Sequence, residues 1–123
     1  MSRTVEASCH CGAVVITAEL SGDEMRPRRC TCSFCRRRQA GNVSARADSL
    51  VILRGVEALT RYQFGTRTAE HYFCRHCGIY THHLRRSDTS EIGINIGCIA
   101  GATPWDHEPM EWTDGINHPS DRG

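Results

Sequence analysis

Seven of the eight cysteines in this 123-residue chain fall into three compact clusters. The clusters are Cys9 with Cys11, Cys30 with Cys32 and Cys35, and Cys74 with Cys77. Four thiolates form the closed tetrahedral ligand set of a structural zinc site. We therefore expect the first and third clusters to share one zinc ion, which would contribute about 10 kcal/mol to folding.

The middle cluster offers only three closely spaced sulfurs, so it cannot fill four positions around a metal from its own residues. Three protein ligands and one exchangeable position are typical of catalytic zinc. We expect Cys30, Cys32 and Cys35 to hold a second, catalytic zinc ion. The alternative is a fourth protein ligand that makes this site structural too. The candidates for that ligand are His71, His82, His83 and Cys98.

The local backbone is expected to help each cysteine pair present its sulfurs. Cys9 and Cys11 are two residues apart, and in a strand such residues lie on the same face. Cys74 and Cys77 form a C-x2-C knuckle followed by Gly78. Glycine there can adopt the left-handed conformation and let backbone N–H groups face the thiolates. Each pair should therefore direct two sulfurs at one ion.

All fifteen basic residues are arginine, whose planar guanidinium suits bidentate binding of carboxylates or phosphates. Ser33 is expected to cap a short helix next to the middle cluster. That helix carries Arg36, Arg37 and Arg38, which are the candidates for binding the carboxylates of a substrate. The alternative is that these arginines form a solvated basic face.

Short runs rich in β-branched residues, separated by glycine-containing turns, indicate a mainly β architecture. We expect strands at residues 13–20, 43–45, 50–53, 59–64, 69–73, 79–84 and 91–96. The last of these has isoleucine at every other position, as for one buried face. The segment from Gly101 on is rich in turn residues. Trp105 and Trp112 in that segment are expected to pack over the sheet.

A chain of this length fits a single domain, 1–123, with a core at about 5–113 and a tail at 114–123. Hydrophobic residues make up 39% of the chain and aromatic residues 7%, which favours metal crosslinks over packing alone. The N-terminus lacks an apolar stretch of signal-peptide length, and later apolar runs are strand-sized. We therefore expect a cytoplasmic protein with no membrane partner, in which clustered cysteines bind metal rather than form disulfides.

Five blocks follow one another along the chain in a specific order, at residues 8–14, 30–37, 64–66, 71–79 and 95–99. Ordered cysteine spacing of this kind is more specific than a single C-x2-C pair. Over residues 6–100, the blocks resemble those of the glutathione-dependent formaldehyde-activating enzyme family, whose relatives include centromere protein V.

This resemblance implies a fold and a reaction. The fold would be mainly β, of the beta-tent type, in a small zinc-stapled domain with short helical segments. Two zinc ions would be bound, one structural and one catalytic, with glutathione binding at the catalytic one. The family reaction joins glutathione and formaldehyde into S-hydroxymethylglutathione. The expected function is therefore that of a zinc-dependent carbon-sulfur lyase acting on glutathione or a similar thiol and on formaldehyde or a small aldehyde.

Two other functions could use the same residues. One is a zinc-stabilised binding module whose arginine-rich segment binds nucleic acid or an acidic partner. The formal net charge is only +1, and zinc-bound thiolates would make it negative, so nucleic-acid binding is not favoured. The other is a thiol redox sensor in which the middle cluster loses zinc on oxidation and forms a disulfide.

Overall fold

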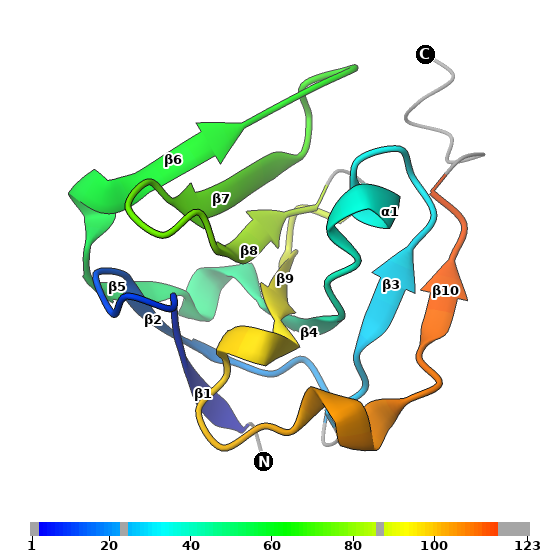
Figure 1. Cartoon of the computed structure of the whole chain (residues 1–123), viewed down its shortest axis with the longest axis horizontal. Coiled ribbons are helices and arrows are strands. Elements are labelled where there is room, and N and C mark those ends of the chain that lie inside the picture. Colours follow the sequence, from blue (N-terminus) through cyan, green and yellow to red (C-terminus); the bar gives the residue numbers. More distant parts are fainter. Residues whose placement is uncertain (1–2, 23–24, 86–87, 116–123) are drawn as a thin grey trace.

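Strands, mostly paired antiparallel, are the main regular elements of the structure, a computed structural model that describes residues 3–22, 25–85 and 88–115 (Figure 1). The strands in these ranges form two sheets, one of three strands and one of seven. The mainly β fold with short helical segments, predicted from the sequence, is confirmed. The predicted tail at 114–123 lies outside the described residues from position 116 on.

The small sheet contains the N-terminal part of the chain. Its strands, in the order β1-β2-β5, are β1 (Thr4–Ser8), β2 (Val15–Glu19) and β5 (Val51–Arg54), all paired antiparallel. Ser8 pairs with Val15, so the chain reverses direction between them. Cys9 and Cys11 lie in this connection, at one end of the small sheet.

The large sheet has the strand order β10-β3-β4-β9-β8-β7-β6. Its strands are β3 (Arg28–Cys30), β4 (Asn42–Arg46), β6 (Leu59–Tyr62), β7 (Glu70–Cys74), β8 (Tyr80–Leu84), β9 (Glu91–Asn95) and β10 (Glu111–Thr113). β3 and β10 pair in parallel and lie side by side in Figure 1, whereas the other described pairs are antiparallel.

Helical structure is confined to short connections. They are helix α1 (Cys35–Arg38) and the 3-10 segments η1 (Ala47–Ser49), η2 (Val56–Ala58), η3 (Ile96–Cys98) and η4 (Pro104–His107). Within the described ranges, no helix has the length and apolar character needed to cross a bilayer.

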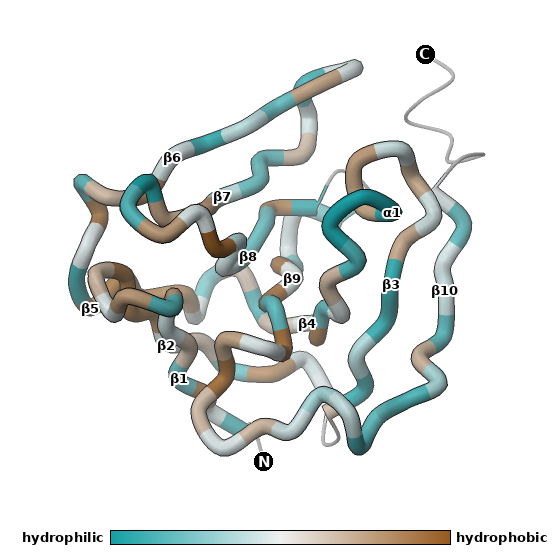
Figure 2. The backbone as a smooth tube through the Cα atoms, viewed as in Figure 1, coloured by the Kyte–Doolittle hydropathy of each residue, from teal (hydrophilic) through white to brown (hydrophobic). Residues whose placement is uncertain are grey.

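The hydrophobic core lies between the small sheet and strands β4 and β9 of the large sheet. Ile92, Ile94 and Ile96 are each at most 1% exposed, which confirms the alternating pattern predicted for this strand. Ile16 of β2 is fully buried in the same cluster. Figure 2 shows hydrophobic residues along β2, β5 and β9, whereas α1 and β3 are mostly hydrophilic.

The opposite face of the large sheet is polar. Val43 and Ala45 of β4 are buried in the core. Because side chains alternate along a strand, Asn42 and Ser44 point to the other face. Both residues line a cavity there, together with His83 of β8. One face of the large sheet therefore stabilises the fold, and the other builds a site.

The seven strands predicted from the sequence are all present, with bounds that differ by at most two residues. Strands β1, β3 and β10 were not predicted. β3 and β10 have three residues each and no alternating apolar pattern, so their main-chain pairing leaves little signal in the sequence. Their absence from the prediction matters, because β3 carries the first cysteine of the middle cluster.

The expectation that both tryptophans pack over the sheet is wrong. Trp105 is 73% exposed and Trp112 is 45% exposed. Aliphatic side chains of the two sheets already fill the core, and Trp112 belongs to β10 at the edge of the large sheet. Its ring instead lies 5.8 Å from the guanidinium carbon of Arg29.

Gly55 lets the chain pass closely by the first cysteine turn, and its replacement should destabilise the fold. Its φ is +89°, and an added Cβ would collide with the backbone of Ala13. We expect Gly55→Ala to lower the free energy of unfolding by about 2–4 kcal/mol, from left-handed strain and overpacking. Gly101→Ala is the matched control, since Gly101 has φ +79° but open space around it, and should cost about 1 kcal/mol. Urea denaturation of both variants measures the difference, and equal losses would contradict the proposed collision.

Candidate metal centres

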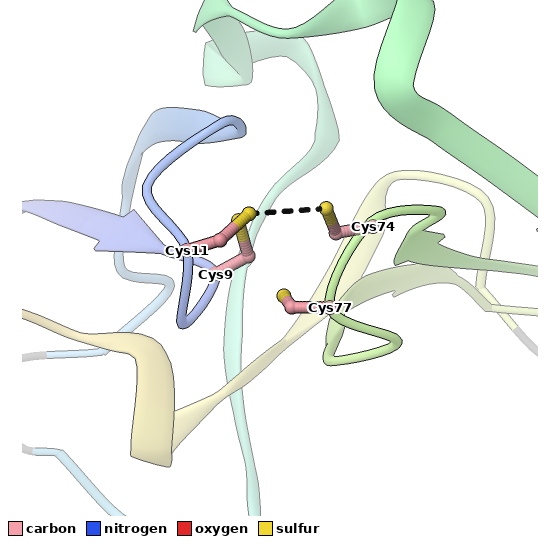
Figure 3. Close-up of side chains that lie close together, drawn as sticks. All are labelled: Cys9, Cys11, Cys74 and Cys77. Carbon is pink, nitrogen blue, oxygen red and sulfur yellow. Dashed lines mark hydrogen bonds between the residues drawn. The ribbon is translucent and has the colours of Figure 1, made fainter.

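Four cysteines from two turns point their sulfurs at one another (Figure 3). Cys9 and Cys11 come from the turn after β1, and Cys74 and Cys77 come from the end of β7 and the turn that follows. All four Sγ atoms lie within 4.8 Å of one another. The Cys9–Cys11 and Cys11–Cys74 sulfur distances are both 3.7 Å. A tetrahedron with Zn–S bonds of about 2.3 Å has edges of about 3.8 Å, so this spacing fits zinc.

The backbone around these sulfurs is arranged for negative charge. Val14 N–H donates to Cys9 Sγ at 3.3 Å, and His76 N–H donates to Cys74 Sγ at 3.4 Å. Gly78 has φ +75°, the left-handed conformation expected for it. Backbone N–H groups of Cys11 and Ile79 lower the pKa of Cys77 to about 6. The turns therefore stabilise thiolates, the form in which cysteine binds metal.

Cys9 and Cys11 do not lie on a strand, contrary to the expectation from their spacing. β1 ends at Ser8, and the turn that follows is closed by a bond from Gly12 N–H to the Cys9 carbonyl at 3.2 Å. Gly12 has φ +80°, which a strand does not allow. The turn brings both sulfurs to one side by curling the backbone, rather than by strand alternation.

Cys30, Cys32 and Cys35 form a second group, with all three Sγ atoms within 4.8 Å of one another. Cys30 ends β3, Cys32 lies in the following turn, and Cys35 begins α1. Cys35 N–H donates to Cys32 Sγ at 3.2 Å. Phe34 is the N-cap residue of α1 and makes no side-chain cap bond, so the expected Ser33 cap is wrong. A sulfur takes up the N–H of the first helical residue instead.

The three sulfurs of this group are close enough to control one another's ionisation. Hydrogen bonds from Cys30 and Cys35 hold the pKa of Cys32 far below its usual range. Contacts with Cys30 and Cys32 raise the pKa of Cys35 far above its usual range. Without a cation, the group therefore carries one negative charge more readily than three. A divalent ion would allow all three thiolates to form together, so the donor set fits a metal.

None of the four candidates for a fourth ligand joins this group, which in the described residues consists of three sulfurs alone. His82 Nδ1 is 2.8 Å from Thr81 Oγ1, and Cys98 Sγ donates to the Tyr80 carbonyl at 3.4 Å. His83 Nδ1 is 2.6 Å from Tyr80 Oη.

His82 and His83 have pKa values below the usual range of histidine, so both are uncharged at neutral pH. Burial lowers the pKa of His82 to about 4, and burial together with Arg38 holds the pKa of His83 well below its usual range. His71 and His83 stack with ring centroids 5.2 Å apart. Both rings line the cavity next to the three sulfurs and give it an aromatic wall.

The three arginines of α1 point in different directions. Arg38 turns inward, where its Nη2 donates to Cys35 Sγ at 3.4 Å and its Nη1 to His71 Nδ1 at 3.1 Å. Its guanidinium carbon lies 3.6 Å from the centroid of the Tyr80 ring. Arg36 and Arg37 are exposed, and Arg37 donates to the Ser33 carbonyl at 2.6 Å. Arg38 therefore helps to hold Cys35 in place through a hydrogen bond to its sulfur.

A cavity of about 450 Å³ opens over the second cysteine group. Its walls include all three cysteines, Phe64 and the stacked histidines. Four arginines that the sequence analysis did not single out also line it, and they are Arg26, Arg28, Arg29 and Arg85. Arg36, Arg37 and Arg38 are not among the residues that line it. The missed arginines lie on or next to strands β3 and β8, and no local motif links them to the cysteines.

The segment after β10 closes one wall of the cavity. Thr31 N–H donates to the Thr113 carbonyl at 3.0 Å, and Gly115 N–H donates to Thr31 Oγ1 at 3.0 Å. A Cβ at Gly115 would collide with the sulfur of Cys30. The chain therefore passes directly against the cysteine group at this point.

Comparison with known proteins agrees with this geometry. A curated Halomonas elongata protein named "Putative glutathione-dependent formaldehyde-activating enzyme" is 38% identical in an alignment 82 residues long, which covers 59% of this chain and 51% of the relative. This chain thus spans about half the length of that relative. The crystal structure of a Rhodobacter sphaeroides protein is 54% identical and matches with a TM-score of 0.84, over 88% of this chain and 99% of that one.

A family model matches most of the chain. The model of the family described as glutathione-dependent formaldehyde-activating enzyme matches residues 4–114, a range that contains both cysteine groups and every residue that lines the cavity except Gly115. This chain belongs to the glutathione-dependent formaldehyde-activating enzyme family.

Proposed function

We propose that this protein binds glutathione or a similar thiol beside Cys30, Cys32 and Cys35 and forms or cleaves its adduct with formaldehyde or a small aldehyde. The observation that carries the proposal is the three-sulfur group in the wall of a cavity of about 450 Å³. In a structural zinc site, a fourth protein ligand would take the position that an outside thiol needs. The family membership of the chain supports the same reaction.

The two cysteine groups would hold two zinc ions with different roles. Cys9, Cys11, Cys74 and Cys77 form a closed set of four sulfurs outside the cavity, as a structural site requires. The catalytic site would use the three sulfurs inside it. A zinc ion there would supply a positive charge that keeps a visiting thiol ionised at neutral pH.

The reaction needs few further groups. The thiol sulfur forms a bond to the carbonyl carbon while the C=O double bond opens, and the proton lost by the thiol ends on the former carbonyl oxygen. The reverse reaction breaks the same carbon-sulfur bond, which is the basis for expecting a carbon-sulfur lyase. The residues of the cavity would hold the two reactants together and so lower the entropic barrier. The stacked His71 and Phe64 rings limit the access of water on one side.

We keep the cytoplasm as the expected compartment, because thiols remain reduced there and are available for zinc. A second function, the binding of nucleic acid through the arginines of α1, has less support. Arg38 is directed at Cys35 and His71, so the run does not form a continuous basic surface.

The two proposed metal roles predict different outcomes when one cysteine of each group is replaced by serine. Cys35→Ser should keep one zinc ion and the fold but lose the reaction, because only the open site is broken. Cys77→Ser should lose folding, because the closed site contributes about 10 kcal/mol. Cys98→Ser is the matched control and should keep both zinc ions, since Cys98 belongs to neither group. Metal analysis with circular dichroism checks all three, and equal damage from Cys35→Ser and Cys77→Ser would mean that the roles are misassigned.

The proposed reaction can be followed directly. In a mixture of protein, glutathione and formaldehyde, exchange NMR should detect adduct formation faster than in buffer. Cys35→Ser should return the rate to that of buffer, whereas Cys98→Ser should leave it unchanged. Wild-type protein with both zinc sites filled and a rate no faster than buffer would exclude this reaction for these substrates.

Arg38 is expected to hold Cys35 in position for metal binding. Arg38→Gln should weaken zinc binding at the second site about 10- to 100-fold, as is typical when a partner of a metal ligand is removed. Arg38→Lys keeps the charge and should weaken it less. Competition with a zinc chelator measures both. The zinc ion at Cys9, Cys11, Cys74 and Cys77 should be retained in each variant, and unchanged affinity in Arg38→Gln would remove this role.

A further inference from the structure

The cavity has two chemically different ends, and the sheet register determines which residues lie at each. Cys30 and Arg28 are two residues apart on β3, so their side chains share a face. Arg28 pairs with Asn42 of β4, and Ser44 follows two residues later on the same face. Along the direction of these antiparallel strands, Arg28 therefore lies between Cys30 and Ser44, and Ser44 is about 13 Å from Cys30.

Arg85 lies at the end of the cavity that is far from the sulfurs. It directly follows β8, and its Nη2 donates to Ser44 Oγ at 2.7 Å. Its Nη1 is 3.6 Å from Glu91 Oε1, an ion pair beyond hydrogen-bond distance. A guanidinium has five N–H donors, and the contacts of Arg85 within the described residues use one. Arg85 is thus held in place at the cavity wall with donors left over.

Arg28 lies between the two ends of the cavity and could also bind an anion. Its Nε is 3.6 Å from Glu111 Oε2, and both side chains are more than half exposed. Such a pair is weak in water and competes poorly with a bound anion. Arg29, in contrast, forms two hydrogen bonds with Glu108, at 3.0 and 2.8 Å, and a third to the Gln39 carbonyl at 2.9 Å. Arg29 is therefore committed to the protein.

We propose that Arg85, supported by Ser44 and assisted by Arg28, binds a carboxylate of the thiol substrate. This inference rests on the proposed function and names the residues that would select the substrate, a thiol with a carboxylate that can reach roughly 10 Å from its sulfur, about the span of three extended residues. Arg85 is already oriented by Ser44 and Glu91, so a carboxylate can form paired N–H···O bonds with little loss of side-chain freedom. Short or uncharged thiols would reach the sulfurs without using this end of the cavity.

Affinity measurements on the intact, zinc-loaded protein test the proposal. Arg85→Gln should weaken glutathione binding about 10- to 100-fold in calorimetry, since a charge-assisted contact is lost. The diethyl ester of glutathione, which has no free carboxylate, should bind weakly and equally to wild type and variant. Arg61→Gln is the matched control, because Arg61 of β6 pairs with Glu70 of β7 and does not line the cavity. It should bind glutathione as wild type does.

The outcomes separate this inference from the proposed function. Equal glutathione affinity in wild type and Arg85→Gln, or equal affinity of wild type for glutathione and its diethyl ester, would overturn the carboxylate site alone. Failure of the wild-type protein to bind any thiol would overturn both. Zinc content and circular dichroism of Arg85→Gln exclude a folding defect. If that variant fails to fold, Arg28→Gln tests the same site, with a loss of at least several-fold in glutathione affinity expected.

Discussion

Four negatively charged sulfurs cannot share a space a few ångströms across unless a cation lies between them. Cys9 and Cys11 lie in the turn between two strands of the small sheet, whereas Cys74 ends β7 of the large sheet and Cys77 lies in the turn that follows, so an ion there would join the two sheets. Backbone N–H groups already face the sulfurs. We expect the rest of the fold to depend on this junction, because the aliphatic core between the sheets is modest.

We expect the second cysteine group to depend on the first, although the two share no residue. The core, together with a metal ion in the first group, would fix one face of the large sheet, and the polar face behind it presents walls of the cavity. Asn42 and Ser44 point into the cavity because Val43 and Ala45 are held in the core. With the roles proposed above, a structural ion and a catalytic ion would be held by separate cysteine groups, so that stability and chemistry would not compete for one ion.

Much of this arrangement could be predicted from the sequence, and the parts that could not have a common cause. The cysteine pairs could be predicted because a spacing of two or three residues brings their sulfurs together. Most of the strands could be predicted because they contain runs of β-branched residues. Arg28 and Arg85 gave no such signal, because they meet at the cavity only through the register of β3, β4 and β8. Arg36, Arg37 and Arg38 are adjacent in sequence, but successive residues of a helix point about 100° apart, so only Arg38 reaches the cysteines.

The contact between Thr31 and the segment after β10 affects how the molecule is assembled during synthesis. Once Cys77 has emerged from the ribosome, all four sulfurs of the closed group are available, so they could bind metal before Thr113 and Gly115 are in place. The wall of the cavity forms only when Thr113 and Gly115 are present, because these residues form hydrogen bonds with Thr31, more than eighty residues earlier in the chain. Until Thr113 and Gly115 have also emerged, a nascent chain holds the sulfurs of Cys30, Cys32 and Cys35 without this wall, and the site becomes enclosed only when these two residues bond to Thr31.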